Sequence, residues 1–237
     1  MRVKPLADCR LYAFVDTGYL RGRAPELVAQ QLCEGGADLI QLRAKEATAD
    51  EVRRLAERLL AVTEHAGAGV GLVINDHWGI AREIGAPLCH LGQEDFFARG
   101  FSHASQLLAT PGDGAGAGTP MPAPDLRAHS PPRIGLSTHA PAQAERAVAA
   151  GAAYVAIGPV YGTPTKPAAR PVTLEYVRWA AARLRLPWFA IGGINLGNLD
   201  DVLAAGATRI CVVSAILNAP DAARACREFK ERLLSSP

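Results

Sequence analysis

The sequence lacks the features that mark several broad classes of protein. It contains no run of 18 apolar residues, and a membrane-spanning helix needs about that many. Its formal net charge is only +2, which gives no reason to expect binding to nucleic acid or to a membrane surface. Residues 1–5 carry no apolar core of a secretory signal, so we expect a cytoplasmic protein.

The cysteines of this chain do not stand at the spacings that bind zinc or form a redox pair. The chain has 5 cysteines, and none stands in a CxxC pair or at the spacing of zinc ligands. Two of them, Cys89 and Cys211, lie inside apolar runs, where cysteine behaves as a small hydrophobic residue. We expect all of them to be structural thiols, as in a reducing cytoplasm.

Short apolar runs recur along the chain. Its 237 residues, 49% of them hydrophobic, can bury a core that needs no disulfide or metal. The apolar runs lie at residues 11–15, 38–42, 70–74, 87–91, 133–136, 154–157, 188–191 and 209–213. Most are continuous rather than alternating, which is typical of parallel strands covered on both faces.

Amphipathic stretches between these runs predict helices. Residues 50–65 place four apolar side chains on one face at helical spacing, namely Val52, Leu55, Leu59 and Val62. The stretch after Asp221 shows the same spacing, and Gly151 and Gly206 follow alanine-rich runs as helix stops. Strand–helix alternation repeated eight times predicts an α/β fold, a (β/α)8 TIM barrel, as a single domain over residues 1–237. An open doubly wound sheet is the alternative, although about six strands are more usual there.

One segment interrupts the alternation. Residues 110–132 are rich in glycine, alanine and proline and offer little that can pack into a core. We expect a flexible surface loop inserted into the barrel, with a functional lid as the alternative. Because the strand–helix pattern resumes directly after it, the segment does not indicate a domain boundary.

Polar side chains gather after the apolar runs, where the strands of such a barrel carry the active site. The basic ones are Arg43, Lys45 and Lys166, and the hydroxyl-bearing ones include Thr163, Thr165 and Ser214. Such side chains neutralise phosphate groups and donate hydrogen bonds to them. Gly192 and Gly193 allow backbone N–H groups to approach an anion closely. The pattern predicts a phosphorylated substrate.

Two carboxylates follow neighbouring apolar runs and suit a magnesium ion. Asp76 and Asp95 supply hard oxygen ligands of the kind that Mg²⁺ takes together with substrate phosphates. Each has a simpler interpretation, because Asp76 can cap a helix and Asp95 can be an exposed loop acid. Ser137 can likewise be a helix cap. His90 and the three tryptophans are expected to be structural, and His139 is left outside the catalytic set.

Seven segments in a fixed order are more specific than any one of them: QLRAK, VINDHWGIA, CHLGQED, IGLSTH, YVAIGPVYGTPTK, AIGGI and CVVSAI. In this order they resemble the signature blocks of the thiamine-phosphate synthase family, from about Leu11 to Leu234. The resemblance implies a transferase of thiamine biosynthesis. Members couple 4-amino-2-methyl-5-(diphosphooxymethyl)pyrimidine to a thiazole phosphate and release thiamine phosphate and pyrophosphate. Diphosphate leaves first, and the thiazole nitrogen traps the resulting methylene cation.

The resemblance also implies roles for individual residues. The pyrimidine diphosphate would be held by Gln41, Leu42, Arg43, Ala44, Lys45, Asn75, Ser137 and Lys166. The thiazole phosphate would be surrounded by Thr163, Pro164, Thr165, Gly193, Val213 and Ser214. Arg43, Lys45, Ser137 and Lys166 would take part in catalysis, while Asp76 and Asp95 would bind the cofactor Mg²⁺. A cation that forms beside a leaving anion needs electrostatic stabilisation rather than a strong base, and this residue set agrees.

Other functions stay open at this point. Gly162 stands where the family often has proline, a departure that removes no presumed ligand. A related thiazole tautomerase would need no pyrimidine diphosphate, and a catalytically silent paralogue would only sense thiazole or thiamine phosphate. The intact carboxylate pair and the basic cluster favour the synthase. The expected partners are small-molecule substrates, and a homo-oligomer is left open.

Overall fold

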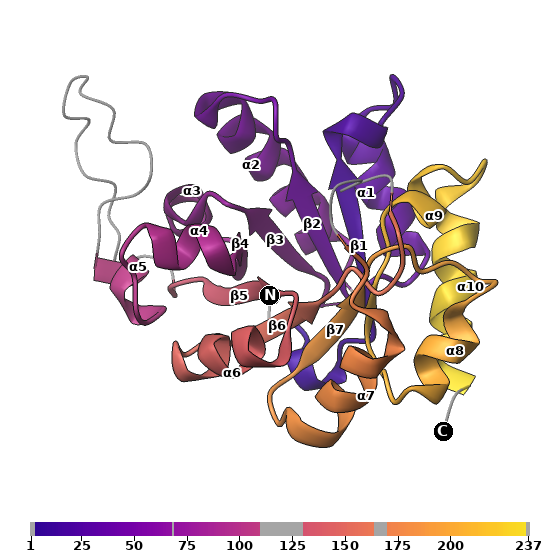
Figure 1. Ribbon diagram of the computed structural model, residues 1–237. Coiled ribbons are helices and arrows are strands. Elements are labelled where there is room, and N and C mark those ends of the chain that lie inside the picture. The colour runs from indigo at the N-terminus through magenta and orange to yellow at the C-terminus, as the bar shows by residue number, and fades with distance from the viewer. Residues whose placement is uncertain (1–2, 68, 110–129, 164–169, 236–237) are drawn as a thin grey trace.

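The computed structural model of the chain describes residues 3–67, 69–109, 130–163 and 170–235. Within them, eight parallel strands close into a barrel, with each strand paired to the next and β8 paired to β1 (Figure 1). The strands are β1 (Leu11–Asp16), β2 (Leu39–Arg43), β3 (Gly71–Asn75), β4 (Leu88–Gly92), β5 (Arg133–Thr138), β6 (Tyr154–Ile157), β7 (Trp188–Ile191) and β8 (Ile210–Cys211). The predicted (β/α)8 barrel is confirmed, and the open doubly wound sheet is wrong.

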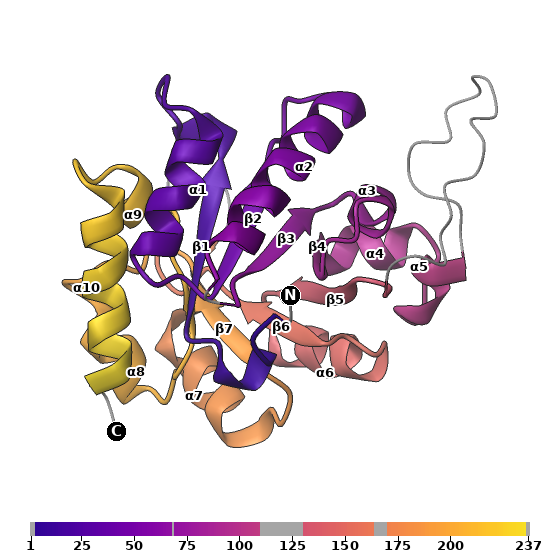
Figure 2. The same ribbon diagram turned by 180° about the vertical axis from the view of Figure 1, so that it is seen from behind.

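Helices surround the barrel, as both views show (Figures 1 and 2). They are α1 (Pro25–Glu34), α2 (Ala49–His65), α3 (Trp78–Glu83), α4 (Gln93–Ala98), α5 (Ser105–Ala109), α6 (Pro141–Ala149), α7 (Thr173–Arg183), α8 (Leu199–Ala204), α9 (Ser214–Leu217) and α10 (Ala222–Ser235). Short 3-10 helices lie at Leu6–Asp8 and Thr17–Tyr19. In the described part of the chain, no helix is long and apolar enough to span a membrane.

Local sequence signals explain where helices begin and end. At the start of α2, the Thr48 hydroxyl accepts a hydrogen bond from the Glu51 N–H, and the Glu51 carboxylate accepts one from the Thr48 N–H. This capping box satisfies two backbone donors that the first helical turn leaves unpaired. Gly151 and Gly206 follow α6 and α8 with φ of 75° and 97°, a backbone conformation that glycine adopts without steric cost. The predicted helix stops are confirmed.

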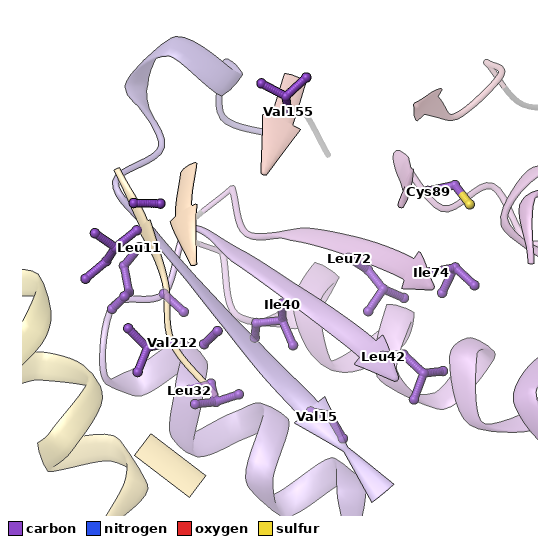
Figure 3. Close-up of a cluster of buried hydrophobic side chains, with 14 of the residues drawn as sticks. Leu11, Val15, Leu32, Ile40, Leu42, Leu72, Ile74, Cys89, Val155 and Val212 are labelled. Carbon is purple, nitrogen blue, oxygen red and sulfur yellow. The ribbon is translucent and has the colours of Figure 1, made fainter. Parts of the chain in front are cut away.

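Alternation along the strands divides the buried residues into two clusters. Odd-numbered residues of β1, such as Leu11 and Val15, pack outward against the helices, and Figure 3 shows them with Leu32 of α1. Tyr12 and Phe14, at even positions, face the barrel interior and pack with residues such as Phe189. The alternation follows from strand geometry, because successive side chains point to opposite faces of the sheet. Every strand therefore sends alternate residues toward the barrel axis.

A buried carboxylate joins the N-terminal segment, the entry to β2 and the C-terminal helix. Asp38 is 6% exposed and accepts hydrogen bonds from Lys4 Nζ at 2.8 Å and from the Arg10 and Leu11 backbone N–H groups at 2.7 and 3.0 Å. Lys230 of α10 forms a second ion pair with it. Burial by itself would raise the pKa of Asp38, but these hydrogen bonds outweigh burial and lower that pKa below its ordinary value.

Other expectations have mixed outcomes. All five cysteines are free thiols, as expected. Trp78 and Trp188 are buried, which agrees with a packing role. Residues 110–129 lie outside the described part of the chain, so the flexible loop stays a prediction, and so does the lid.

Candidate active site

A cavity lies at the carboxyl ends of the strands, where the sequence predicted the active site. The predicted residues that line it are Gln41, Arg43, Lys45, Asn75, Asp76, Asp95, Ser137, Thr163, Gly193, Val213 and Ser214. They come from the carboxyl ends of seven strands, β2 to β8, and from the segments that follow them. Pro164, Thr165 and Lys166 lie outside the described residues.

Alternation along the end of β2 and the two residues after it supplies three of these side chains. Gln41, Arg43 and Lys45 line the cavity. Between them, Leu42 and Ala44 are buried in the outer cluster that packs against the helices. The predicted substrate contacts of Leu42 and Ala44 stay a prediction, but their side chains cannot make them, because adjacent side chains along a strand point to opposite faces. For Leu42 and Ala44, this leaves only backbone groups as candidates for substrate contact.

A carboxylate that the sequence analysis missed holds Arg43. Asp16 ends β1 directly opposite Arg43 in the strand register, and its Oδ2 lies 2.7 Å from Arg43 Nη1. Asp16 is only 2% exposed, and its Oδ1 accepts a hydrogen bond from the Gly18 N–H at 3.0 Å. Both carboxylate oxygens are thus engaged, which limits the rotation of this group. The available signal was an acid at the end of the first apolar run.

Asp76 occupies an unusual backbone conformation between two hydrogen-bond donors. Its φ is 66°, which is uncommon for residues other than glycine. Its Oδ2 accepts hydrogen bonds from Lys45 Nζ at 2.6 Å and from Asn75 Nδ2 at 2.7 Å, while its N–H donates to the His90 carbonyl at 2.9 Å. The alternative role as a helix cap is wrong, because α3 begins after His77 and has no side-chain cap.

Asp95 approaches the same cavity from the first turn of α4. It lies against Gly92, where an added Cβ would stand 2.9 Å from Asp95 Oδ2. Glycine at this strand end therefore gives the carboxylate room to fold back toward the cavity. Strands β3 and β4 are neighbours, so Asp76 and Asp95 line adjacent parts of one wall.

Two carboxylates are too few to hold a metal ion by protein ligands alone, but they suit magnesium. No group of three or more His, Cys, Asp or Glu side chains in the described ranges is placed to hold a metal ion. Mg²⁺ commonly takes one or two carboxylates and completes its shell with phosphate oxygens and water. Zinc, in contrast, usually requires three or four protein ligands. The donor set at Asp76 and Asp95 therefore suits an ion that arrives with a phosphorylated substrate.

The opposite wall is formed by glycine and hydroxyl groups. Gly193 has φ of 65°, and a Cβ there would stand 2.5 Å from the Gly162 carbonyl oxygen, so only glycine fits without strain. Ser214 is the first residue of α9 and follows Val213.

Ser137 donates to the Leu91 carbonyl at 3.4 Å and does not cap α6, whose N-cap residue is Ala140. The alternative cap role for Ser137 is therefore wrong.

His139 also lines the cavity, although it was left outside the predicted set. Its Nδ1 is hydrogen-bonded to the Gly158 carbonyl oxygen, and its backbone N–H donates to Gln143 Oε1 at 2.6 Å. Because a carbonyl oxygen only accepts hydrogen bonds, Nδ1 must carry the proton in the neutral ring. That tautomer leaves Nε2 as an acceptor.

Aromatic residues form the floor of the cavity, and the sequence analysis did not predict them. Tyr12 and Phe14 stack with ring centroids 5.2 Å apart, and His90 and Cys211 lie beside them. The signal was present, because Tyr12 and Phe14 alternate with small aliphatic residues in the first apolar run. His90 was expected to be a hydrogen-bonded residue within a strand, and its Nδ1 lies 3.1 Å from the Tyr154 hydroxyl.

Comparisons with known proteins agree on one family. A family model described as thiamine monophosphate synthase matches residues 11–108 and 116–216. The chain is 45% identical over 200 residues to a thiamine-phosphate synthase of Thermus thermophilus, with 84% of each chain covered. It is 39% identical over 233 residues to the thiamine-phosphate synthase of Acidothermus cellulolyticus, with 98% of each chain covered.

A solved structure shares the fold. Thiamine phosphate pyrophosphorylase from Pyrococcus furiosus superimposes with a TM-score of 0.75 at 24% sequence identity, and the match covers 98% of this chain and 99% of that one. At this identity the likeness supports the fold alone. The fold is therefore supported independently of the sequence comparisons.

Proposed function

Because this chain belongs to the thiamine monophosphate synthase family, we propose that the cavity at its barrel mouth carries out the family's transferase reaction. The reaction joins the aminopyrimidine diphosphate to the thiazole phosphate and releases thiamine phosphate and pyrophosphate. One observation carries the assignment of this site. Cationic side chains and two carboxylates line one wall, while a glycine and a hydroxyl at the ends of β7 and β8 line the same cavity.

In the proposed mechanism, Arg43 and Lys45 bind the diphosphate of the pyrimidine substrate. Asp16 keeps the Arg43 guanidinium in place, and the remaining guanidinium donors can turn toward phosphate oxygens. Lys45 exchanges its contact with Asp76 for one with the diphosphate. As the bond to the diphosphate breaks, these cations stabilise the negative charge that collects on the leaving group.

Asp76 and Asp95 are the residues that would hold Mg²⁺. When bound, the ion supplies Lewis-acid stabilisation of the departing diphosphate. The residues fit this role because two carboxylates at neighbouring strand ends repel each other unless a cation lies nearby. Lys45 is the cation beside Asp76 in this structure.

The thiazole phosphate is proposed to lie against Thr163, Gly193 and Ser214. The backbone N–H groups after β7 and the hydroxyls can donate to its phosphate oxygens without a metal. This anchoring holds the thiazole nitrogen beside the methylene carbon, so that the cation is trapped before water reaches it. Ser137, on the β5 side of the cavity, is proposed to contact the pyrimidine.

A single assay tests the function. The purified chain is supplied with both substrates and Mg²⁺, and thiamine phosphate and pyrophosphate are measured by chromatography. Equal amounts of both products, which depend on both substrates, support the synthase. Conversion of the thiazole alone would indicate the tautomerase, and binding without product would indicate the sensor.

The same proposal includes the setting of the enzyme. Its substrates are charged small molecules of biosynthesis, and all five thiols are free. Both properties suit the cytoplasm.

A further inference from the structure

The loop between β1 and α1, residues 17–24, contacts two distant parts of the barrel rim. Strand β1 pairs with β2 on one side and with β8 on the other, so its loop lies between the segments that follow those strands. At the start of the loop, Thr17 Oγ1 donates to the Arg43 carbonyl at the end of β2, at 3.5 Å. At its end, Arg23 Nη2 donates to the Leu217 carbonyl of α9 at 2.6 Å. The loop thus joins the end of β2 to the helix after β8.

Arg23 also holds its own loop in shape. Its backbone N–H donates to the Leu20 carbonyl at 3.0 Å, and the two residues between them, Arg21 and Gly22, have φ of 51° and 80°. Positive φ at both central residues is the pattern of a type I′ turn. The guanidinium folds back over this turn and donates through Nε to the Leu20 carbonyl and through Nη2 to the Tyr19 carbonyl, each at 3.0 Å. One rigid, planar group therefore joins three carbonyls, two in the loop and one in α9.

Helix α9 depends on contacts from outside itself. It spans only Ser214–Leu217, and a helix of a single turn is not stable alone. The buried side chains of Ile216 and Leu217 attach it to the core. The last carbonyls of a helix, however, have no partner within it. Arg23 supplies the partner of the Leu217 carbonyl and thereby fixes the C-terminal end of α9.

The other end of the same turn lies at the cavity. Val213 and Ser214 line it, whereas Arg23 is not among the described residues that do so. The Asn218 N–H donates to the Ser214 carbonyl at 2.9 Å, so the two ends of α9 belong to one hydrogen-bonded turn. A shift at Leu217 therefore moves the Ser214 hydroxyl as well. Any influence of Arg23 on a substrate must act through this helix.

We propose that Arg23 is a positioning residue, which fastens α9 to the loop after β1 and so holds Ser214 in place for the second substrate. The inference rests on the proposed function, in which Ser214 contacts the thiazole phosphate. The two ends of the loop then serve different substrates. Asp16, just before the loop, holds the cation for the pyrimidine diphosphate, and Arg23 holds the helix for the thiazole phosphate.

The discriminating variant is Arg23→Met, which keeps a long side chain and removes every donor. We expect the KM for the thiazole phosphate to rise about tenfold and the KM for the pyrimidine diphosphate to stay within about twofold. Arg23→Lys keeps a charged donor and should recover part of the loss. Asp16→Asn should give the reverse pattern, with the larger change for the pyrimidine diphosphate. If Arg23→Met raises both KM values equally, Arg23 supports the fold in general and the proposal is wrong.

Arg21→Met is the matched control. Arg21 lies in the same turn, is exposed, and has no hydrogen bond or ion pair with the part of the chain that the structure describes. The control removes the same charge from the same loop without touching α9, so both KM values should stay within about twofold. An equal rise of the thiazole phosphate KM in Arg21→Met and Arg23→Met would assign the effect to the charge of the loop and overturn the proposal.

Hydrogen exchange of α9 gives a readout that does not depend on turnover. The Leu217 and Asn218 N–H groups donate to the Val213 and Ser214 carbonyls, each at 2.9 Å. Their exchange, followed by NMR, should be about tenfold faster in Arg23→Met and unchanged in Arg21→Met. Unchanged exchange in Arg23→Met would overturn the proposal. A native protein that forms no thiamine phosphate, but whose α9 exchanges faster in Arg23→Met, would contradict the proposed function and leave the fastening of α9 by Arg23 standing.

Discussion

At the scale of single residues, Asp76 combines an uncommon backbone conformation with a carboxylate oxygen, Oδ2, that accepts two hydrogen bonds. Its φ of 66° costs free energy, and its carboxylate is held by Lys45 and Asn75. Strained residues that their neighbours hold in place cluster at functional sites. Asp95 has no such strain and reaches the cavity because Gly92 leaves it room. Different local structures therefore place the two carboxylates at the cavity.

The first prediction concerns these two acids. Asp76→Asn and Asp95→Asn keep the side-chain shape, and asparagine tolerates positive φ, but each variant removes a negative charge. We expect each to lower turnover at least about a hundredfold, roughly 2.7 kcal/mol of barrier. Raised Mg²⁺ should restore part of the rate, and the double variant should be less than additive because both acids act through one ion.

Turnover measured against Mg²⁺ concentration checks this prediction, and circular dichroism confirms that each variant is folded. Asp200→Asn is the control, because Asp200 pairs with Arg232 on the surface and its side chain is 70% exposed. Near-native rates in both single variants would contradict the metal site. Full activity of the native chain in excess EDTA would do the same.

At the scale of elements, the ends of β1 and β2 are joined by an ion pair that belongs to the barrel and to the site at once. Asp16 and Arg43 are direct register partners, so the pair forms wherever these two strands align. Arg43 keeps 19% of its side chain exposed, toward the cavity that it lines. The pairing of β1 with β2 thus holds the Arg43 guanidinium at the cavity in a fixed orientation.

The second prediction follows from that pair. Asp16→Asn leaves Arg43 charged but less firmly held, so we expect the KM for the pyrimidine diphosphate to rise about tenfold. The KM for the thiazole phosphate should change little. Asp50→Asn is the matched control, since it removes the carboxylate of an exposed pair with Arg53 at 3.0 Å on α2. Steady-state kinetics with each substrate varied in turn measures the two KM values. Equal changes in both would indicate a general loss of structure instead of a loosened Arg43.

At the scale of the whole molecule, the Asp38 cluster joins segments that are far apart in the chain. Lys4 and Lys230 both contact the Asp38 carboxylate, as does the start of β1. The first and last segments of the chain are therefore joined at this group. Removing one member of a buried ion pair leaves an uncompensated charge, which typically costs several kcal/mol. The closure of the barrel therefore depends in part on this group.

The third prediction is a pH dependence of stability. Hydrogen bonds hold the pKa of Asp38 below its ordinary value, so its contribution is fully present above the unfolded value of about 3.9 and is lost as pH falls through the folded pKa. Asp38→Asn should lower the free energy of unfolding by roughly 3 kcal/mol at neutral pH. Below about pH 4 its stability should fall less steeply than that of the native chain.

Urea unfolding at a series of pH values measures this difference. Asp200→Asn serves again as the control, because its exposed pair should leave the slope unchanged. Parallel pH profiles for the native chain and Asp38→Asn would show that Asp38 does not carry the acid sensitivity.

The sequence by itself determined the barrel, the family and the positions of the polar strand ends. Apolar runs and helical spacing are local patterns, so the eight strands and the helices such as α2 follow from neighbouring residues. The predicted positions of Gln41, Arg43 and Asp76 at the cavity follow equally, because all strands of a parallel barrel end at one face.

Tertiary structure alone decided which side chains at those ends act together. The outward packing of Leu42, the pairing of Asp16 with Arg43 and the contact between Tyr12 and Tyr154 each require the closed barrel. Tyr12 and Tyr154 are separated by 142 positions in the chain, and no local pattern relates residues at that distance. Their meeting is set by strand register and by the packing of the barrel interior, which depend on every strand at once.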